Sequence, residues 1–330
     1  YELTVFFFFF CKSMKCNKMF KQFEFYVNDQ SASQKEQQQF FSFIESLELS
    51  QNASFVFRGN SNVIDYYSTD ADDIPLLSHY IFCIGDKGRY FLQKDLIDFK
   101  EIFPVIWNKF NDKVCKLNFR SEQTKQHVLH FLKCNPEIQQ YFSNEQNRKS
   151  FECISDLPIE DRKKVADYYL SILHTIGKSA NGKSFFLSAS KNYMVADEFK
   201  GANSIIIYGW LPQKGINNHI IKYIDVEKSS SFVKKIGLPT CNVPIYPEQR
   251  EICIKCGLLP NYIIGFQHDN KFYINPNILK IQWHDNIVYD GLDIDQKNFN
   301  DLLTKSKYSQ SFIYYDGDYY LISVNGVNGV

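Results

Sequence analysis

A glutamine and a glutamate lie two residues apart within the segment YPEQREICIKCGLLPNYIIGF, residues 246–266. We expect Gln249 and Glu251 to open a strand, where side chains two residues apart point to the same face. Both side chains could then reach one cleft, while Glu248 and Arg250 point the other way. A carboxylate positioned in this way can stabilise positive charge that develops on a sugar while its glycosidic bond breaks.

Two further segments carry polar residues at the ends of expected strands. Arg58 follows the strand-like run SFVF, and its guanidinium could hold a diphosphate through paired hydrogen bonds. Gly59 would let a flat ligand approach the backbone closely. The segment FFLSAS ends a second strand in the hydroxyl residues Ser188 and Ser190. Each segment alone also fits an ordinary turn or a strand edge, so the signal is their joint occurrence in this order.

In the order Arg, Ser, Glu, the three segments resemble the toxin-like Arg/Ser/Glu branch of the ADP-ribosyltransferase superfamily. The resemblance covers roughly residues 54–266 as three separate islands. It implies that Glu251 is the catalytic glutamate and that Arg58 and Gly59 contact NAD. It also implies that Ser188 and Ser190 brace the glutamate and the nicotinamide-side ribose, although Ala189 replaces the middle hydroxyl residue that the family carries.

The same resemblance implies roles for residues around this NAD site. Gln249 would help to choose the acceptor, and a glutamine at this position tends to accompany acceptors other than arginine. Tyr246 lies in a proline-rich loop, residues 238–247, that would touch the acceptor. Phe199 could stack on nicotinamide, although a core position is an equally good reading of a single aromatic residue.

The activity implied by the resemblance is mono-ADP-ribosyl transfer. NAD would be the substrate, no metal would be needed, and the acceptor would be a macromolecule, either a protein side chain other than arginine or a nucleic-acid base. A toxin, an effector or an anti-phage defence protein would fit, with an antitoxin or inhibitor protein as a further partner and no membrane partner. Such a protein would act in the cytoplasm or after delivery into the cytosol of a target cell.

A competing motif lies at residues 177–184, where GKSANGKS matches the phosphate-binding pattern G-x-x-x-x-G-K-[ST]. That loop normally follows a strand and opens a helix whose first turn binds the phosphate. Here an expected helix ends near His174 and a strand follows the motif, so the order is reversed, and Gly177 fits a helix C-cap. A P-loop nucleotide hydrolase and a non-catalytic binding module are therefore the alternative readings.

The composition is that of a globular protein without a strong charge bias. The chain has 330 residues, 44% hydrophobic and 22% charged, and its 37 basic residues balance its 37 acidic ones. Zero net charge provides no general attraction to nucleic acid or membrane. The nine cysteines form no framework pattern and are interpreted as reduced cytosolic thiols. Neither Cys253-x-x-Cys256 nor the seven histidines show the spacing of a metal site, so the histidines are interpreted as ordinary core or surface residues.

The order of elements predicts an α+β fold. The apolar pattern is helical from about 95 to 175, most clearly at 161–174, and strand-like afterwards, with a hairpin at 313–322. Together with the resemblance, this order of helices and strands implies two packed, mainly antiparallel sheets and a helical insertion at about 93–176. Residues 19–330 would form this single domain, and residues 1–18 are interpreted as an appendage or a mis-assigned start.

Overall fold

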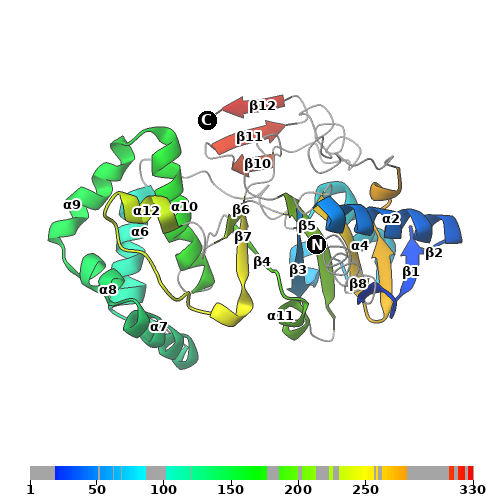
Figure 1. Ribbon diagram of the computed structural model, residues 1–330, viewed down its shortest axis with the longest axis horizontal. Helices are drawn as coiled ribbons and strands as arrows, with labels where there is room; N and C mark the ends of the chain where they lie inside the picture. Colours follow the sequence, from blue (N-terminus) through cyan, green and yellow to red (C-terminus); the bar gives the residue numbers. More distant parts are fainter. Residues whose placement is uncertain are drawn as a thin grey trace, which may run out of the picture.

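The computed structural model describes most of the chain and arranges it around one large sheet (Figure 1). The described residues are 19–50, 53–61, 63–67, 69–86, 102–119, 121–176, 186–199, 203–212, 223–225, 230–255, 258, 262–280, 312–315, 319–323 and 326–329. The expected appendage and the GKSANGKS motif lie outside them. Helices and strands are mixed, as predicted.

Nine strands form a mixed, mainly antiparallel sheet in the order β2-β1-β9-β8-β5-β3-β4-β7-β6. Only β1 and β9 pair in parallel. The strands are β1 (Glu24–Val27), β2 (Gln30–Ser31), β3 (Ala53–Asn60), β4 (Phe186–Ser190), β5 (Ile205–Pro212), β6 (Tyr223–Asp225), β7 (Glu251–Lys255), β8 (Ile263–His268) and β9 (Lys271–Ile274).

The expected second sheet packed on the first is not found among the described residues. The strands that carry the candidate site, β3, β4 and β7, are neighbours in a single sheet. A separate sheet contains β10 (Phe312–Tyr315), β11 (Tyr319–Ser323) and β12 (Gly326–Gly329). Pairing of Phe312 with Ile322 and of Tyr315 with Tyr319 confirms the predicted hairpin.

The large sheet is joined in its middle by very little backbone pairing. β3 pairs with β5 along its whole length, and β4 pairs with β7 along all five of its residues. Between β3 and β4, only Phe57 and Ser190 are paired. The sheet therefore consists of a six-stranded part ending at β3 and a three-stranded part, β4-β7-β6, which lie next to each other in Figure 1.

Helices flank both parts of the sheet. Beside the six-stranded part lie α2 (Gln34–Ser50) and α4 (Ile74–His79), and beside the three-stranded part lies a helical group between β3 and β4 in sequence (Figure 1). That group contains α6 (Ile102–Lys109), α7 (Glu122–Cys134), α8 (Pro136–Ser143), α9 (Gln146–Glu152) and α10 (Ile159–Thr175). The remaining helices are α3 (Val63–Tyr67), α11 (Tyr193–Glu198) and α12 (Ser230–Lys235), with π-helical turns η1 (Tyr80–Ile84) and η3 (Phe110–Cys115) and 3-10 turns η4 (Cys153–Asp156), η5 (Pro247–Gln249) and η7 (Ile278–Lys280).

The long helix α10 is the centre of the helical group. It starts directly after Pro158, as the sequence predicts, because a proline before the first turn removes no intrahelical hydrogen bond. Tyr169 on α10 packs against Phe110, Phe142 and Phe151, with ring centroids 5.3 to 5.5 Å apart. This aromatic cluster fixes the position of α10 and therefore of the residues in its last turn.

Gly59 allows α11 to lie directly on β3. A Cβ atom at this position would be 2.0 Å from the carbonyl oxygen of Ala196, so no side chain fits without moving the helix. The close approach that the sequence suggested for a ligand is made here by the backbone of α11.

We expect Gly59→Ala to lower the free energy of unfolding by about 2 kcal/mol or more, because overpacking against backbone cannot be relieved by a rotamer change. Urea denaturation measures the change. Gly237→Ala is the control: its φ is +79° but nothing lies within 4 Å of the added atom, so it should cost only about 1 kcal/mol of backbone strain. Equal losses in the two variants would contradict the overpacking explanation.

Candidate functional site

The three polar segments that the sequence singled out meet at the junction of the two parts of the sheet. Ser188 Oγ on β4 donates a 2.5 Å hydrogen bond to Oε1 of Glu251 on β7. Arg58 Nη1 on β3 donates to the main-chain oxygen of Ser188 at 2.9 Å. The Arg58 and Glu251 side chains are only 11% and 12% exposed. Residues far apart in the chain thus form one shielded polar group around Ser188.

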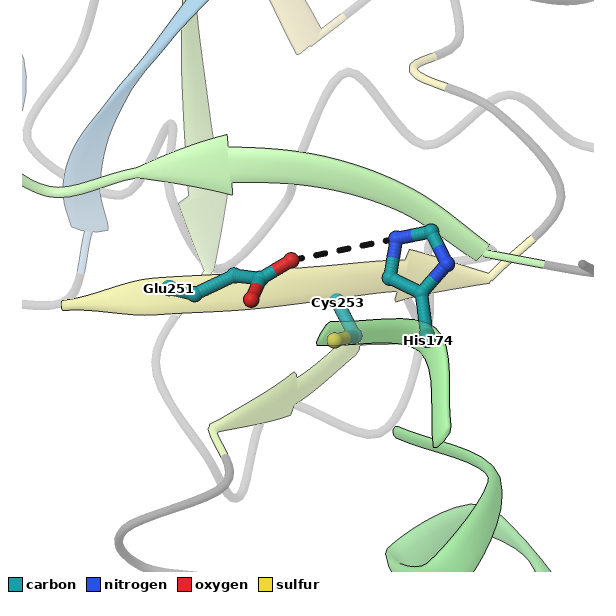
Figure 2. A group of neighbouring side chains, drawn as sticks. All are labelled: His174, Glu251 and Cys253. Atoms are coloured by element: carbon teal, nitrogen blue, oxygen red, sulfur yellow. Dashed lines mark ion pairs between the residues drawn. The ribbon is translucent and has the colours of Figure 1, made fainter. Parts of the chain in front are cut away.

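His174 belongs to this polar group, although the sequence gave it no special role. It lies in the last turn of α10, and its Nε2 is 2.8 Å from Ser188 Oγ. The same nitrogen is 3.8 Å from Glu251 Oε1 (Figure 2). The sequence grouped His174 with histidines that more often take core or surface positions, and the structure places it beside two of the predicted site residues. No spacing rule could have found it, since its partners lie on separate strands.

The order of contacts differs from that of a nucleophilic triad. In a serine hydrolase, the histidine lies between the serine and the acid and removes the serine proton. Here Ser188 lies between His174 and Glu251 and donates its own proton to the carboxylate. This arrangement holds the carboxylate in place and does not prepare Ser188 for attack.

Arg58 connects β3 to two other segments. Its Nε lies 2.7 Å from Oδ2 of Asp86, whose side chain is fully buried. The Tyr67 hydroxyl donates to the other carboxylate oxygen of Asp86, and the Asp86 backbone pairs with Leu258 in an isolated bridge. With its bond to Ser188, Arg58 therefore links β3 and β4 where the backbone pairing is weakest. The sequence contained no signal for Asp86.

Gln249 does not share a strand face with Glu251, and this prediction is wrong. β7 begins at Glu251, whereas Gln249 ends the turn η5. Between them, Arg250 has a left-handed backbone with φ 44° and ψ 48°, which breaks the strand alternation. The Gln249 side chain is half-buried, and its main-chain oxygen accepts a 2.7 Å hydrogen bond from Ser190 Oγ. Ser190 therefore holds the turn before the glutamate.

The loop that the resemblance assigns to the acceptor is anchored by the helical group. Buried Asn135, between α7 and α8, bonds through its side chain to the backbone of Asn242 and Val243. From α10, the Tyr169 hydroxyl donates to Pro239 O, and the Tyr168 hydroxyl accepts from the backbone of the next part of the loop. The helices thereby fix the segment that leads into η5 and β7.

Two predicted ligand contacts lie at the edges of the site. Tyr246 is half-buried with its ring centroid 4.9 Å from that of His127, and burial, followed by the charges of Glu248 and Glu251, raises its pKa. Phe199 follows α11 and is 52% exposed, so the alternative reading of Phe199 as a core residue is wrong. Both rings are partly accessible, as contact with a ligand would require.

His174, Glu251 and Cys253 offer three possible metal ligands whose donor atoms lie within 4.8 Å of one another (Figure 2). Imidazole, carboxylate and thiolate are donors that zinc accepts. However, the Ser188 hydroxyl already bonds to both His174 and Glu251, and a metal bound to both would have to displace it. The contacts therefore fit a hydrogen-bonded group better than a metal centre.

Comparison with known proteins assigns the chain to no family. No protein-family model, no curated protein and no solved structure matches the chain. In the described part of the chain, no helix has the length and apolar character needed to cross a membrane.

Burial sets the charge state of Glu251. Loss of hydration raises its pKa from 4.5 to about 7, and the Ser188 hydrogen bond and the Arg58 charge only partly oppose this shift. Near neutral pH, a small change in surroundings therefore moves Glu251 between its acid and its carboxylate form.

We expect the Asp86→Asn variant to unfold about 3 kcal/mol more easily than the wild type, because Arg58 would keep a buried charge without its counter-ion. Urea denaturation measures the loss. Asp72→Asn is the matched control, since Asp72 is 89% exposed and its contact with His268 lies at the surface. A loss below about 1 kcal/mol for Asp86→Asn would show that the ion pair does not hold the junction.

We also expect Glu251 to make the protein less stable as pH rises from about 4.5 to 7. In this range, unfolded Glu251 has lost a proton that the folded state still holds, so higher pH favours unfolding. Across this pH window, the free energy of unfolding of Glu251→Gln should rise by on the order of 3 kcal/mol relative to that of the wild type. Denaturation at each pH measures this difference. The variant Glu248→Gln, at an exposed carboxylate, should keep the wild-type slope, and equal slopes in all three proteins would contradict the raised pKa.

Proposed function

We propose that the protein is a mono-ADP-ribosyltransferase that transfers ADP-ribose from NAD to a macromolecular acceptor. The contact between Ser188 and Glu251 carries this proposal. The resemblance requires a serine that braces the catalytic glutamate, and these two side chains form a 2.5 Å hydrogen bond in a shielded site. Arg58, the third residue of the resemblance, bonds to the same serine.

In the proposed reaction, the bond between nicotinamide and ribose breaks and its electron pair leaves with nicotinamide. Positive charge develops on the ribose, and an acceptor atom then forms the new bond to C1′ and releases a proton. Oε1 of Glu251 is held by Ser188, so the other oxygen of the carboxylate would receive the hydrogen bond from a ribose hydroxyl. Because the side chain is largely shielded from water, its negative charge stabilises the transition state strongly.

The junction between β3 and β4 is where the proposal places NAD. The family resemblance implies a nucleotide bound between two sheets, and the single large sheet has its weakest pairing at this junction. Arg58 forms an ion pair with Asp86 and a hydrogen bond to Ser188 O, so its first role in the proposal is to hold Ser188 in register. Contact with the NAD diphosphate would be a second role.

The proposed acceptor is a protein side chain other than arginine or a nucleic-acid base. Gln249 and Tyr246 lie in the segment that enters β7, both half-buried, and could contact the acceptor before it reaches the ribose. A toxin, effector or defence role in a cytosol remains part of the proposal, with an antitoxin or inhibitor protein as a further partner.

The rival nucleotide-hydrolase reading gains no support from the elements around the GKSANGKS motif. α10 ends at Thr175 before the motif, and β4 begins at Phe186 after it. A phosphate-binding loop needs the opposite order, with the strand first and the helix second.

The test is release of labelled nicotinamide from NAD by the purified protein. Glu251→Gln should lower the rate about 100-fold or more, since it removes the charge that stabilises the transition state. Lys183→Ala is the matched control and should keep the wild-type rate of nicotinamide release. In a separate experiment, NAD labelled in its adenylate part is added to a lysate, and the label found in protein or RNA identifies the acceptor. No nicotinamide release by the wild type, or phosphate release from ATP or GTP that Lys183→Ala abolishes, would overturn the proposal.

A further inference from the structure

His174 reaches the catalytic carboxylate through Ser188 rather than directly. Its Nε2 lies 2.8 Å from Ser188 Oγ but 3.8 Å from Glu251 Oε1, which is too long for a hydrogen bond. Ser188 Oγ is 2.5 Å from Glu251 Oε1. The three side chains therefore form a chain of two hydrogen bonds with the serine hydroxyl in the middle.

The number of protons determines the direction of both bonds. A hydroxyl has one proton to donate, and an ionised carboxylate can only accept. When Glu251 is ionised, the Ser188 proton must point to Glu251, so Nε2 of His174 must carry the proton that is donated to Ser188 Oγ. Two hydrogen bonds aligned in one direction strengthen each other.

The helical group holds His174 at this distance. His174 lies five residues after Tyr169, which packs in the aromatic cluster, and its own ring centroid is 5.8 Å from that of Phe186 at the start of β4. The His174 side chain is 11% exposed. Because Tyr169 anchors α10 and Phe186 contacts the imidazole, His174 has little freedom to leave Ser188.

We propose that His174 is a positioning residue that donates from Nε2 to Ser188 Oγ, directs the serine proton to Oε1 of Glu251 and thereby leaves the other carboxylate oxygen for the substrate hydroxyl. The helical group between β3 and β4 would then be part of the catalytic apparatus and not a separate attachment. The hydrogen-bond chain follows from the geometry alone, whereas its effect on turnover rests on the proposed transferase activity.

Variants at position 174 separate donation from packing. Glutamine places an N–H near the position of Nε2, while leucine fills a similar volume without a donor. His174→Leu should lower kcat for nicotinamide release about 30-fold with KM for NAD changed less than about threefold, because a poorly oriented carboxylate stabilises the transition state less well. His174→Gln should stay within about fivefold of the wild-type kcat.

A double-mutant cycle tests whether the effect passes through Ser188. If it does, His174→Leu added to Ser188→Ala should change kcat less than about twofold, since the group that transmits the effect is already gone. A full 30-fold loss in the Ser188→Ala background would overturn the proposal, as would a His174→Gln variant that is as slow as His174→Leu.

Nuclear magnetic resonance provides a readout without turnover. In protein with 15N-labelled histidine, the His174 resonances should be those of the form protonated at Nε2. The titration midpoint of Glu251, followed by its 13Cδ shift, should rise by about half a pH unit or more in His174→Leu and Ser188→Ala but not in His174→Gln. Among the described residues, the other charged or titratable side chains near this chain are Arg58 on β3, Cys253 on β7 and Tyr246 before η5, which are unchanged in all variants.

The two proposals fail in different ways. Absence of nicotinamide release from the wild-type protein would reject the transferase, while the histidine spectra and the Glu251 titration would still decide the hydrogen-bond chain. A His174 protonated only at Nδ1, or a Glu251 midpoint that is the same in His174→Leu as in the wild type, would reject the positioning role whatever the activity.

Discussion

The buried ion pair between Arg58 and Asp86 is the interaction on which the middle of the sheet depends. β3 and β4 share one backbone pair, so the two parts of the sheet need a side-chain link. Arg58 provides it by forming an ion pair with Asp86 through Nε and a hydrogen bond to Ser188 O through Nη1. Burying two charges is costly unless their remaining polar atoms are bonded, and Tyr67 supplies such a bond to Asp86.

The position of the candidate site follows from this constraint. The continuous ladder between β4 and β7 places Ser188 beside the strand that carries Glu251. At the weakly paired junction with β3, the Arg58 side chain reaches the main chain of Ser188. The same shielding that strengthens the field of Glu251 also disfavours its ionised form and raises its pKa to about 7. The burial that the proposed glycosidic chemistry would use thus works against the stability of the fold, and the hydrogen bond from Ser188 offsets part of that cost.

Local sequence patterns predicted part of this molecule well. The helix after Pro158, the hairpin near the end and the strands that carry Ser188 and Glu251 all depend on neighbours a few residues away, and all are present. The prediction that Gln249 and Glu251 share a strand face is wrong, because the left-handed backbone of Arg250 breaks the alternation of side chains between the two faces. The described residues do not show the second packed sheet, because β3, β4 and β7 join one large sheet and pairing between such distant strands cannot be read from local pattern.

By itself, the sequence determined which side chains could do chemistry and the short elements that carry them, because helical and strand periodicity arise from contacts within a few residues. Only the tertiary structure decided that Asp86 neutralises Arg58 and that His174 stands next to Ser188. Those contacts join residues on separate elements, and the direction of each hydrogen bond depends on every partner that packing brings within reach. His174 therefore contacts Ser188 because α10 holds the imidazole and β4 holds the serine at the same place.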